Sequence, residues 1–244
     1  EGNELSLSQV QKVLDGERIV ARDRDVQEVI NYRKVVEFIG DKKELAIDEG
    51  TILALHKLTV EMILEEGGGN FRNKEVVIRN SITGEVSFTP PRAIEVEWQM
   101  KDLVEFIQTE KEIHPVLKAG IVHYEFVRVH PFLDGNGRVT RLMTHAYLKK
   151  AKIDGHGLWT VSRGFARNRE GYLAALAGAD QPRRGDLDGR GNLTHAGLLG
   201  FCKFFLKIAI DQIDFMSGLL NLDGMQKRIQ AVVDRQVSFG DLKP

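Results

Sequence analysis

Cysteine is almost absent from this sequence, since Cys202 is the only one in 244 residues. A single thiol cannot form an internal disulfide, so the fold has to be stabilised by a hydrophobic core. Cys202 lies among three phenylalanines at residues 201–205, where we expect a small buried side chain. The lack of paired cysteines and of a visible secretory signal predicts a cytoplasmic protein.

Long hydrophobic runs are also missing. The longest apolar stretch, residues 198–210, is interrupted by Lys203 and Lys207 and is too short to cross a bilayer, so we expect no membrane partner. Neither sign of charge dominates, because the chain contains 34 Lys and Arg residues and 35 Asp and Glu residues. This balance argues against a nucleic-acid-binding protein that relies on bulk charge, but it is compatible with a local basic pocket.

Hydrophobic residues make up 42% of the chain and charged residues 28%, which is typical of a globular domain. Apolar residues recur mostly at steps of three and four, which predicts an all-α fold. Ser6 or Ser8, and Asp48 or Thr51, are suited to cap two of the helices. We expect helices at residues 3–30, 31–39, 47–64, 94–109, 116–129, 139–147, 168–176 and 193–220, and loops at 154–164 and 182–192.

A short β-hairpin interrupts this helical pattern. Residues 76–78 and 86–88 favour extended structure and flank the turn residues 81–84. An isolated hairpin is only marginally stable, so this one must pack against the helices. The predicted fold class is therefore all-α, mainly helical, with a small β-hairpin within residues 71–90.

Residues 130–141 carry most of the chemical information. They read His-Pro-Phe-Leu-Asp-Gly-Asn-Gly-Arg-Val-Thr-Arg and run into a helix pattern. Pro131 ends the preceding helix, so His130 falls at a helix-to-loop junction. Glycines at the next helix start leave backbone N–H groups open to an anion, and the helix dipole adds positive charge there. Arg138 and Arg141 share one face of the first turns and can reach further phosphate oxygens.

Two further side chains complete this interpretation. Asp134 can hold a Mg²⁺ ion that bridges the phosphates, and His130 lies beside them as a general base. Each element alone has an ordinary explanation, because Asp-Gly-Asn-Gly is usually a turn and paired arginines usually face solvent. Their density favours phosphate binding, and with it phosphoryl or nucleotidyl transfer. His123, two turns before His130, is expected to be a hydrogen-bonded core residue.

This block resembles the signature of the Fic family, His-x-Phe-x-(Asp/Glu)-Gly-Asn-Gly-Arg-x-x-Arg, at every fixed position. The similarity extends over roughly residues 1–210. Residues 69–72 and 88–91 resemble the flap of that family, and residues 114–124 resemble the helix that leads into its motif. The fold expected from the family is mainly helical, in agreement with the periodicity.

The resemblance implies a protein adenylyltransferase that binds ATP·Mg²⁺, transfers AMP to a Tyr, Ser or Thr hydroxyl of a target protein, and releases pyrophosphate. In that role His130 deprotonates the hydroxyl and Asp134 holds Mg²⁺. Arg138 binds the β-phosphate and Arg141 the γ-phosphate. The other implied contacts are Gly135, Asn136 and Gly137 with the phosphates, Tyr172 with the adenine, and Val86, Ser87 and Phe88 with the docked target.

Glu1 carries a regulatory inference. Glu1-Gly2-Asn3 resembles the end of the family's inhibitory helix motif, (Ser/Thr)-x-x-x-Glu-(Gly/Asn). The resemblance implies that Glu1 pairs with Arg141 and competes with the γ-phosphate. The sequence starts too late to include the upstream Ser or Thr, so we expect a truncated inhibitory helix.

We expect three segments: helices with the inhibitory remnant at residues 1–64, a Fic core at 65–220, and a polar tail or linker at 221–244. Removal of AMP, or another nucleotide or phosphodiester donor, is an alternative within the family. A regulatory module that senses ATP without turnover is an alternative outside enzymes, although it would have no use for His130. The expected partners are ATP, a protein substrate and a second copy in a homodimer, but not nucleic acid.

Overall fold

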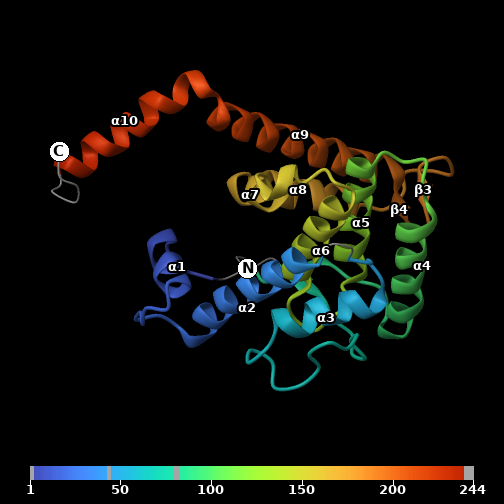
Figure 1. The fold of residues 1–244 in the computed structure, drawn as a ribbon. Helices are drawn as coiled ribbons and strands as arrows, with labels where there is room; N and C mark the ends of the chain where they lie inside the picture. Colours follow the sequence, from blue (N-terminus) through green and yellow to red (C-terminus); the bar gives the residue numbers. More distant parts are fainter. Residues whose placement is uncertain (1–2, 43–44, 80–82, 239–244) are drawn as a thin grey trace.

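The computed structural model describes residues 3–42, 45–79 and 83–238, and within these ranges the protein is mainly helical (Figure 1). The predicted fold class is thereby confirmed. The helices are α1 (Leu7–Leu14), α2 (Asp23–Asp41), α3 (Glu49–Thr59), α4 (Val96–Thr109), α5 (Pro115–Val129), α6 (Asn136–Lys150), α7 (Val161–Arg167), α8 (Arg169–Ala179), α9 (His195–Leu220) and α10 (Leu222–Ser238), with 3₁₀ turns at Ala93–Glu95 and Gly155–Gly157.

The N-terminal helices begin where the capping residues predict. Ser6 accepts a hydrogen bond from the Gln9 N–H to start α1, and Asp48 accepts one from the Thr51 N–H to start α3. The prediction that residues 3–30 are largely helical holds for α1 and for the start of α2, but not for residues 15–22 between them. Gly16 follows α1 with a φ of 81°, a left-handed conformation that ends a helix, and α2 starts only at Asp23.

Helix α5 lies at the centre of the fold and packs against α4, α6 and α9 (Figure 1). Aromatic and aliphatic side chains from these helices and from α2 and α3 share one core. Its largest fully buried members are Tyr124, Phe126, Phe132, Phe201, Phe205, Ile39, Ile47, Ile52, Leu55, Met100, Leu142 and Met143. Because α5 and α6 are both anchored in this core, the loop that joins them is fixed at both ends.

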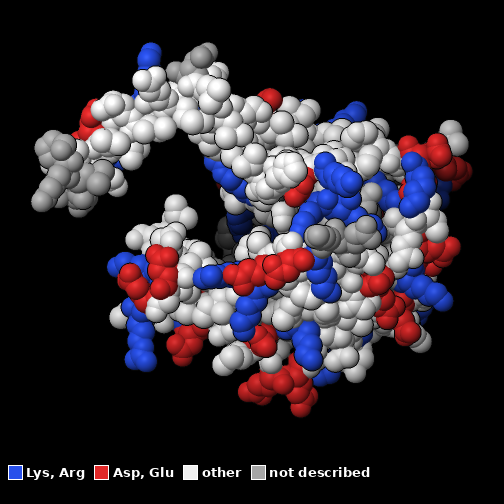
Figure 2. All heavy atoms as spheres, viewed as in Figure 1, with Lys and Arg blue, Asp and Glu red and all other residues white. Residues whose placement is uncertain are grey.

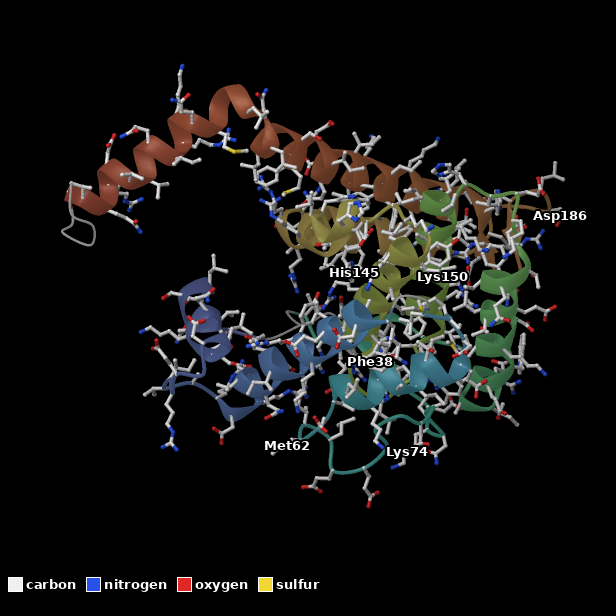
Figure 3. All side chains as sticks on the ribbon, viewed as in Figure 1. Phe38, Met62, Lys74, His145, Lys150 and Asp186 are labelled. Carbon is white, nitrogen blue, oxygen red and sulfur yellow. The ribbon has the colours of Figure 1, made fainter. Side chains whose placement is uncertain are left out.

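Two small antiparallel hairpins complete the described structure. Strands β1 (Ile78–Arg79) and β2 (Val86–Phe88) form the predicted hairpin, with Ile78 opposite Phe88. Strands β3 (Gly189–Arg190) and β4 (Leu193–Thr194) pair within the stretch predicted as a loop. Arg190 fixes this second hairpin because its Nη1 lies 2.9 Å from Glu125 Oε1 on α5. Asp186 projects from the same end of the molecule (Figure 3).

The C-terminal part is more helical than predicted. Helix α7, capped by the Thr160 side chain, starts inside the expected loop at 154–164. Helix α10 occupies most of the segment 221–244 and extends away from the body (Figure 1). Cys202 is buried in α9 as expected, and burial raises the pKa of its thiol to about 11. Among the described residues, none of the helices is both long enough and apolar enough to cross a lipid bilayer.

Candidate functional site

The loop between α5 and α6 brings the motif residues together. Helix α5 ends at Val129, and His130 follows as its C-cap in a left-handed conformation, with φ 50° and ψ 59°. Such a conformation costs a residue other than glycine about 1 kcal/mol or more, so the surroundings must hold it in place. The His130 N–H donates to Phe126 O at 3.1 Å, and Nδ1 lies 3.4 Å from Val127 O. His130 is therefore tied to the last turn of α5.

Asn136 closes the loop. Its Oδ1 accepts a hydrogen bond from the Phe132 N–H at 2.9 Å, and its Nδ2 donates to Phe132 O at 2.7 Å. The side chain is buried, with 4% of Asn136 exposed. It therefore braces the loop from inside, and a contact between Asn136 and an anion has to use the backbone N–H or the second amide hydrogen.

Helix α6 begins without a side-chain cap. Its N-cap is Gly135, in the left-handed conformation with φ 81°, so no N-cap side chain accepts a hydrogen bond from the first backbone N–H groups. The first backbone N–H groups of an α-helix have no acceptor within the helix, and the dipole places positive charge at this end. The N-terminus of α6 therefore has the properties of an anion site, as the sequence predicted.

Replacing Gly135 with alanine should destabilise the protein by more than the backbone conformation alone requires. A Cβ at Gly135 would lie 3.0 Å from Val60 Cγ1, whereas Gly157 has the same φ of 81° and nothing within 4 Å of its Cβ position. We expect Gly157→Ala to cost about 1 kcal/mol and Gly135→Ala about 1–3 kcal/mol more. Urea denaturation of the two variants measures the difference. Equal losses of unfolding free energy in the two variants would show that the contact with Val60 does not affect stability.

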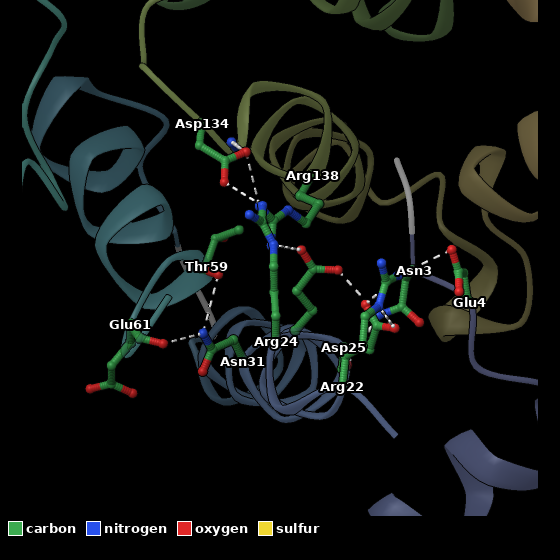
Figure 4. Close-up of polar contacts among 12 residues, drawn as sticks. Asn3, Glu4, Arg22, Arg24, Asp25, Asn31, Thr59, Glu61, Asp134 and Arg138 are labelled. Carbon is green, nitrogen blue, oxygen red and sulfur yellow. Dashed lines mark hydrogen bonds and ion pairs between the residues drawn. The ribbon is translucent and has the colours of Figure 1, made fainter. Parts of the chain in front are cut away.

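Four charged side chains surround the start of α6 (Figure 4). Asp134 Oδ2 lies 2.7 Å from Arg24 Nη2, and Asp134 Oδ1 lies 3.2 Å from Arg138 Nη2. Glu28 Oε1 lies 3.0 Å from Arg138 Nη1 and 3.3 Å from Arg24 Nε. Arg138 and Glu28 are almost completely buried, while Asp134 keeps 31% of its side chain exposed. The cluster thus holds two guanidinium groups next to the anion site, each paired with carboxylates.

A cleft opens beside this cluster. It has a volume of about 720 Å³ and is lined by Arg138 and Arg141 of α6, with Glu28 on its α2 wall. Tyr32 and other side chains of α1 and α2 form an apolar wall. Figure 2 shows this face hollowed between the α1–α2 part and the α9–α10 part, with Lys and Arg side chains at the inner end of the hollow. The two motif arginines therefore point to one shared space.

His56 of α3 contacts the motif loop and holds it in place. Its Nδ1 accepts a hydrogen bond from the Gly69 N–H at 3.0 Å, which leaves the ring proton on Nε2, 3.1 Å from Asp134 O. The ring also stacks on Phe132, with 3.7 Å between ring centroids and 8° between the planes. Burial lowers the pKa of His56 to about 4, partly opposed by its hydrogen bond to Asp134.

This neutral histidine should make stability depend on pH. Burial lowers the pKa of His123 as well, to about 3, whereas an unfolded histidine has a pKa of about 6.5. The unfolded chain therefore binds more protons below that value, so stability falls from pH ~6.5 downward, until pH ~4 for the His56 contribution and until pH ~3 for the His123 contribution. We expect the protonation of each histidine to lower the free energy of unfolding by about 2 kcal/mol between pH 7 and pH 5.

The variant His56→Gln isolates one of these contributions, because His123 is unchanged in it. Urea denaturation at pH 7 and pH 5 should show a loss for the variant that is smaller than the wild-type loss by about 2 kcal/mol. Equal losses in the two proteins would mean that the protonation of His56 is not coupled to folding.

Comparison with known proteins agrees with this geometry. Residues 46–148, which include the motif loop, match the Fic/DOC family. The part of the chain that carries the motif loop is therefore a Fic/DOC domain. The protein adenylyltransferase fic-1 of Caenorhabditis elegans is 30% identical over 161 residues, which are 62% of this chain and 30% of that protein. The protein adenylyltransferase Fic of Drosophila grimshawi is 28% identical over 158 residues, 62% of this chain and 31% of that protein.

Solved Fic structures share the fold. A Fic family protein from Desulfovibrio desulfuricans G20 superposes with a TM-score of 0.74 at 29% identity, over 91% of this chain and 61% of that one. A Fic domain containing signaling protein from Bacteroides thetaiotaomicron superposes with a TM-score of 0.70 at 24% identity, over 88% of this chain and 80% of that one. The chain spans about a third of the length of the two curated relatives.

The other residues predicted for the Fic site lie against the aromatic core, in the flap, or outside the described chain. Tyr172 is part of the aromatic core, with its ring stacked on Phe165 and its hydroxyl 2.9 Å from His123 Nε2. His123 is fully buried and also bonds to Thr144, so its prediction as a hydrogen-bonded core residue is confirmed. Glu1 lies outside the described residues. The flap residues Val86, Ser87 and Phe88 form β2, and Val86 is 48% exposed.

Four residues near the Fic motif were not identified as site residues from the sequence. Arg24 and Glu28 of α2 bond directly to the motif side chains, and His56 and Arg72 bond to the backbone of the motif loop. Among these, Arg72 is the last residue of the stretch 69–72 that resembles the flap, and this resemblance is the local signal that could have identified it. Their contacts connect α2 and α3 to the start of α6, and the flap to the end of α5.

Proposed function

We propose that this Fic domain binds ATP with Mg²⁺ and transfers AMP to a hydroxyl side chain of a target protein. The observation that carries the proposal is the uncapped N-terminus of α6, which lies between a carboxylate, Asp134, and the buried guanidinium of Arg138, next to His130. An anion site, a metal-binding carboxylate and a base are the groups that nucleotidyl transfer requires. Relatives named protein adenylyltransferase support the same reaction.

The donors around α6 suit a triphosphate with a metal ion. The backbone N–H groups of Gly135, Asn136 and Gly137 would bind phosphate oxygens, Arg138 the β-phosphate and Arg141 the γ-phosphate. Among the described residues no group of three or more His, Cys, Asp or Glu side chains is placed to hold a metal. Mg²⁺ is commonly bound by one or two carboxylates together with phosphates, so Asp134 alone fits that ion when the nucleotide is present.

His130 would accept the proton of the target hydroxyl. Its Nδ1 faces Val127 O, which favours a proton on Nδ1 and leaves Nε2 as the acceptor. The hydroxyl oxygen then forms a bond to the α-phosphorus, the bond from that phosphorus to the bridging oxygen of pyrophosphate breaks, and pyrophosphate leaves. Positive charge from Arg138, Arg141 and the helix end stabilises the charge that develops on the phosphates.

The flap and the N-terminal residues have proposed roles beside this centre. An extended target segment would pair with β2, where main-chain hydrogen bonds give affinity without a fixed sequence. Glu1 would pair with Arg141 and compete with the γ-phosphate. In support, Asn3, two residues further along, lines the same cleft as Arg141 and donates a hydrogen bond to Glu28 Oε2 at 3.1 Å.

Two radiolabels of ATP test the proposed function. The protein is incubated with α-labelled or γ-labelled ATP, Mg²⁺ and a cell lysate, and the labelled proteins are separated. AMP transfer predicts label from the α position only. Label from the γ position would mean phosphoryl transfer and would overturn the proposal. Nucleotide binding without label from either position would instead favour an ATP-sensing module.

A further inference from the structure

Arg72 is a buried cation that bonds to backbone carbonyl groups on two sides of the site. Its side chain is fully buried, and Nε donates to His130 O at 2.8 Å while Nη2 reaches Val129 O at 3.3 Å. These carbonyls lie at the C-terminal end of α5, where the last carbonyl groups of a helix lack intrahelical partners and the dipole is negative. The backbone N–H of Arg72 also donates a hydrogen bond to Pro131 O at 2.8 Å.

The same guanidinium joins the two ends of the flap. Nη1 donates to Lys74 O at 3.0 Å just before β1, and Nη2 donates to Pro91 O at 2.5 Å just after β2. Lys74 lies in the loop beneath α3 (Figure 3). A second bridge closes the flap at its base, because the carboxylate of Glu75 accepts from the Ala93 N–H at 3.1 Å. The planar guanidinium of Arg72 thus bonds to the backbone on both sides of the hairpin, at Lys74 and Pro91, and to the carbonyl of His130.

We propose that Arg72 is a positioning residue that couples the flap to the left-handed backbone of His130, and thereby couples target docking to the orientation of the base. The effect of Arg72 on catalysis rests on the proposed function. The coupling between the flap and His130 follows from the hydrogen bonds of Arg72 alone. A guanidinium has five donors in a fixed plane, and a lysine ammonium cannot reproduce this fork.

The test compares Arg72→Lys with Arg79→Lys, a matched change in the same hairpin. Arg79 donates to Gly84 O at 2.9 Å, a bond that stays within the flap. We expect Arg72→Lys to lower kcat by at least about tenfold and to change the Kd of ATP by less than about twofold. The variant Arg79→Lys should keep the wild-type kcat and the wild-type Kd of ATP. A kcat like that of Arg79→Lys, or a parallel loss of kcat and ATP binding, would overturn the inference.

A second measurement needs neither a variant nor catalysis. Native-state hydrogen exchange of the wild-type protein in low urea should give one common opening free energy for peptides from residues 72–79, 83–92 and 127–131. Different opening free energies for the flap and for the end of α5 would overturn the coupling. If wild-type protein fails to transfer AMP but shows common opening, the proposed function fails while the coupling stands.

Discussion

Replacing His130 with alanine should reduce the rate of AMP transfer by about 10²–10⁴-fold and leave ATP binding nearly unchanged. The imidazole is the only proposed acceptor for the hydroxyl proton, and its removal leaves a weak nucleophile. The proposed phosphate contacts come from α6 and its N-terminal amides, which the change does not touch. The loss should therefore appear in kcat, with the Kd of ATP within about twofold of wild type.

His195→Ala is the matched control for this prediction. His195 is exposed at the first turn of α9, outside the residues proposed to touch substrate. It should keep wild-type kcat and Kd. Retention of more than a tenth of the wild-type rate by His130→Ala would show that another group accepts the proton, and the mechanism would have to be revised.

The motif was recognisable from the sequence because its decisive contacts are local. Asn136 bonds to Phe132, four residues away, and Gly135 supplies the turn that starts α6. Short-range patterns of this kind fix their own geometry, so the helix-to-loop junction at His130 and the uncapped start of α6 followed from residue types alone. The hairpin and the capped starts of α1 and α3 were predictable for the same reason.

The supporting residues were not predictable because their partners are far away along the chain. Arg72 is separated from His130 by 58 positions, His56 from Asp134 by 78, and Arg24 from Asp134 by 110. A lone His in α3 or an Arg in α2 has no local feature that distinguishes it from a surface or core residue. Only the packing of α2, α3 and the flap around α6 assigns these side chains to the site.

The error at residues 15–22 has a different cause. The spacing of Val10, Val13 and Leu14 predicts a helix in this stretch but does not show where that helix ends. The backbone instead turns at Gly16, where a left-handed conformation costs little. In contrast, α10 formed where overall polarity suggested a linker, because Leu222, Ile229 and Val232 still recur at helical steps.

Neutralising Asp134 should remove Mg²⁺-dependent nucleotide binding, whereas neutralising Glu28 should not. Both carboxylates pair with Arg24 and Arg138, so they share the same ionic cluster. They differ in exposure, since 31% of the Asp134 side chain but only 8% of the Glu28 side chain reaches solvent. A metal ion needs an accessible carboxylate that can exchange its guanidinium partner for the cation, and Asp134 meets that condition.

The variants Asp134→Asn and Glu28→Gln turn this difference into a measurement. Titration with ATP in the presence and absence of Mg²⁺ should show that wild type and Glu28→Gln gain affinity from the ion, while Asp134→Asn gains little. The rate of AMP transfer should fall by about 10²–10³-fold in Asp134→Asn, because the metal supplies several kcal/mol of charge stabilisation to phosphoryl chemistry. Glu28→Gln should lose mainly stability, since it leaves the buried Arg138 with one charged partner fewer. If instead Glu28→Gln abolishes the Mg²⁺ effect and Asp134→Asn preserves it, the metal-binding carboxylate belongs to α2 and not to the motif loop.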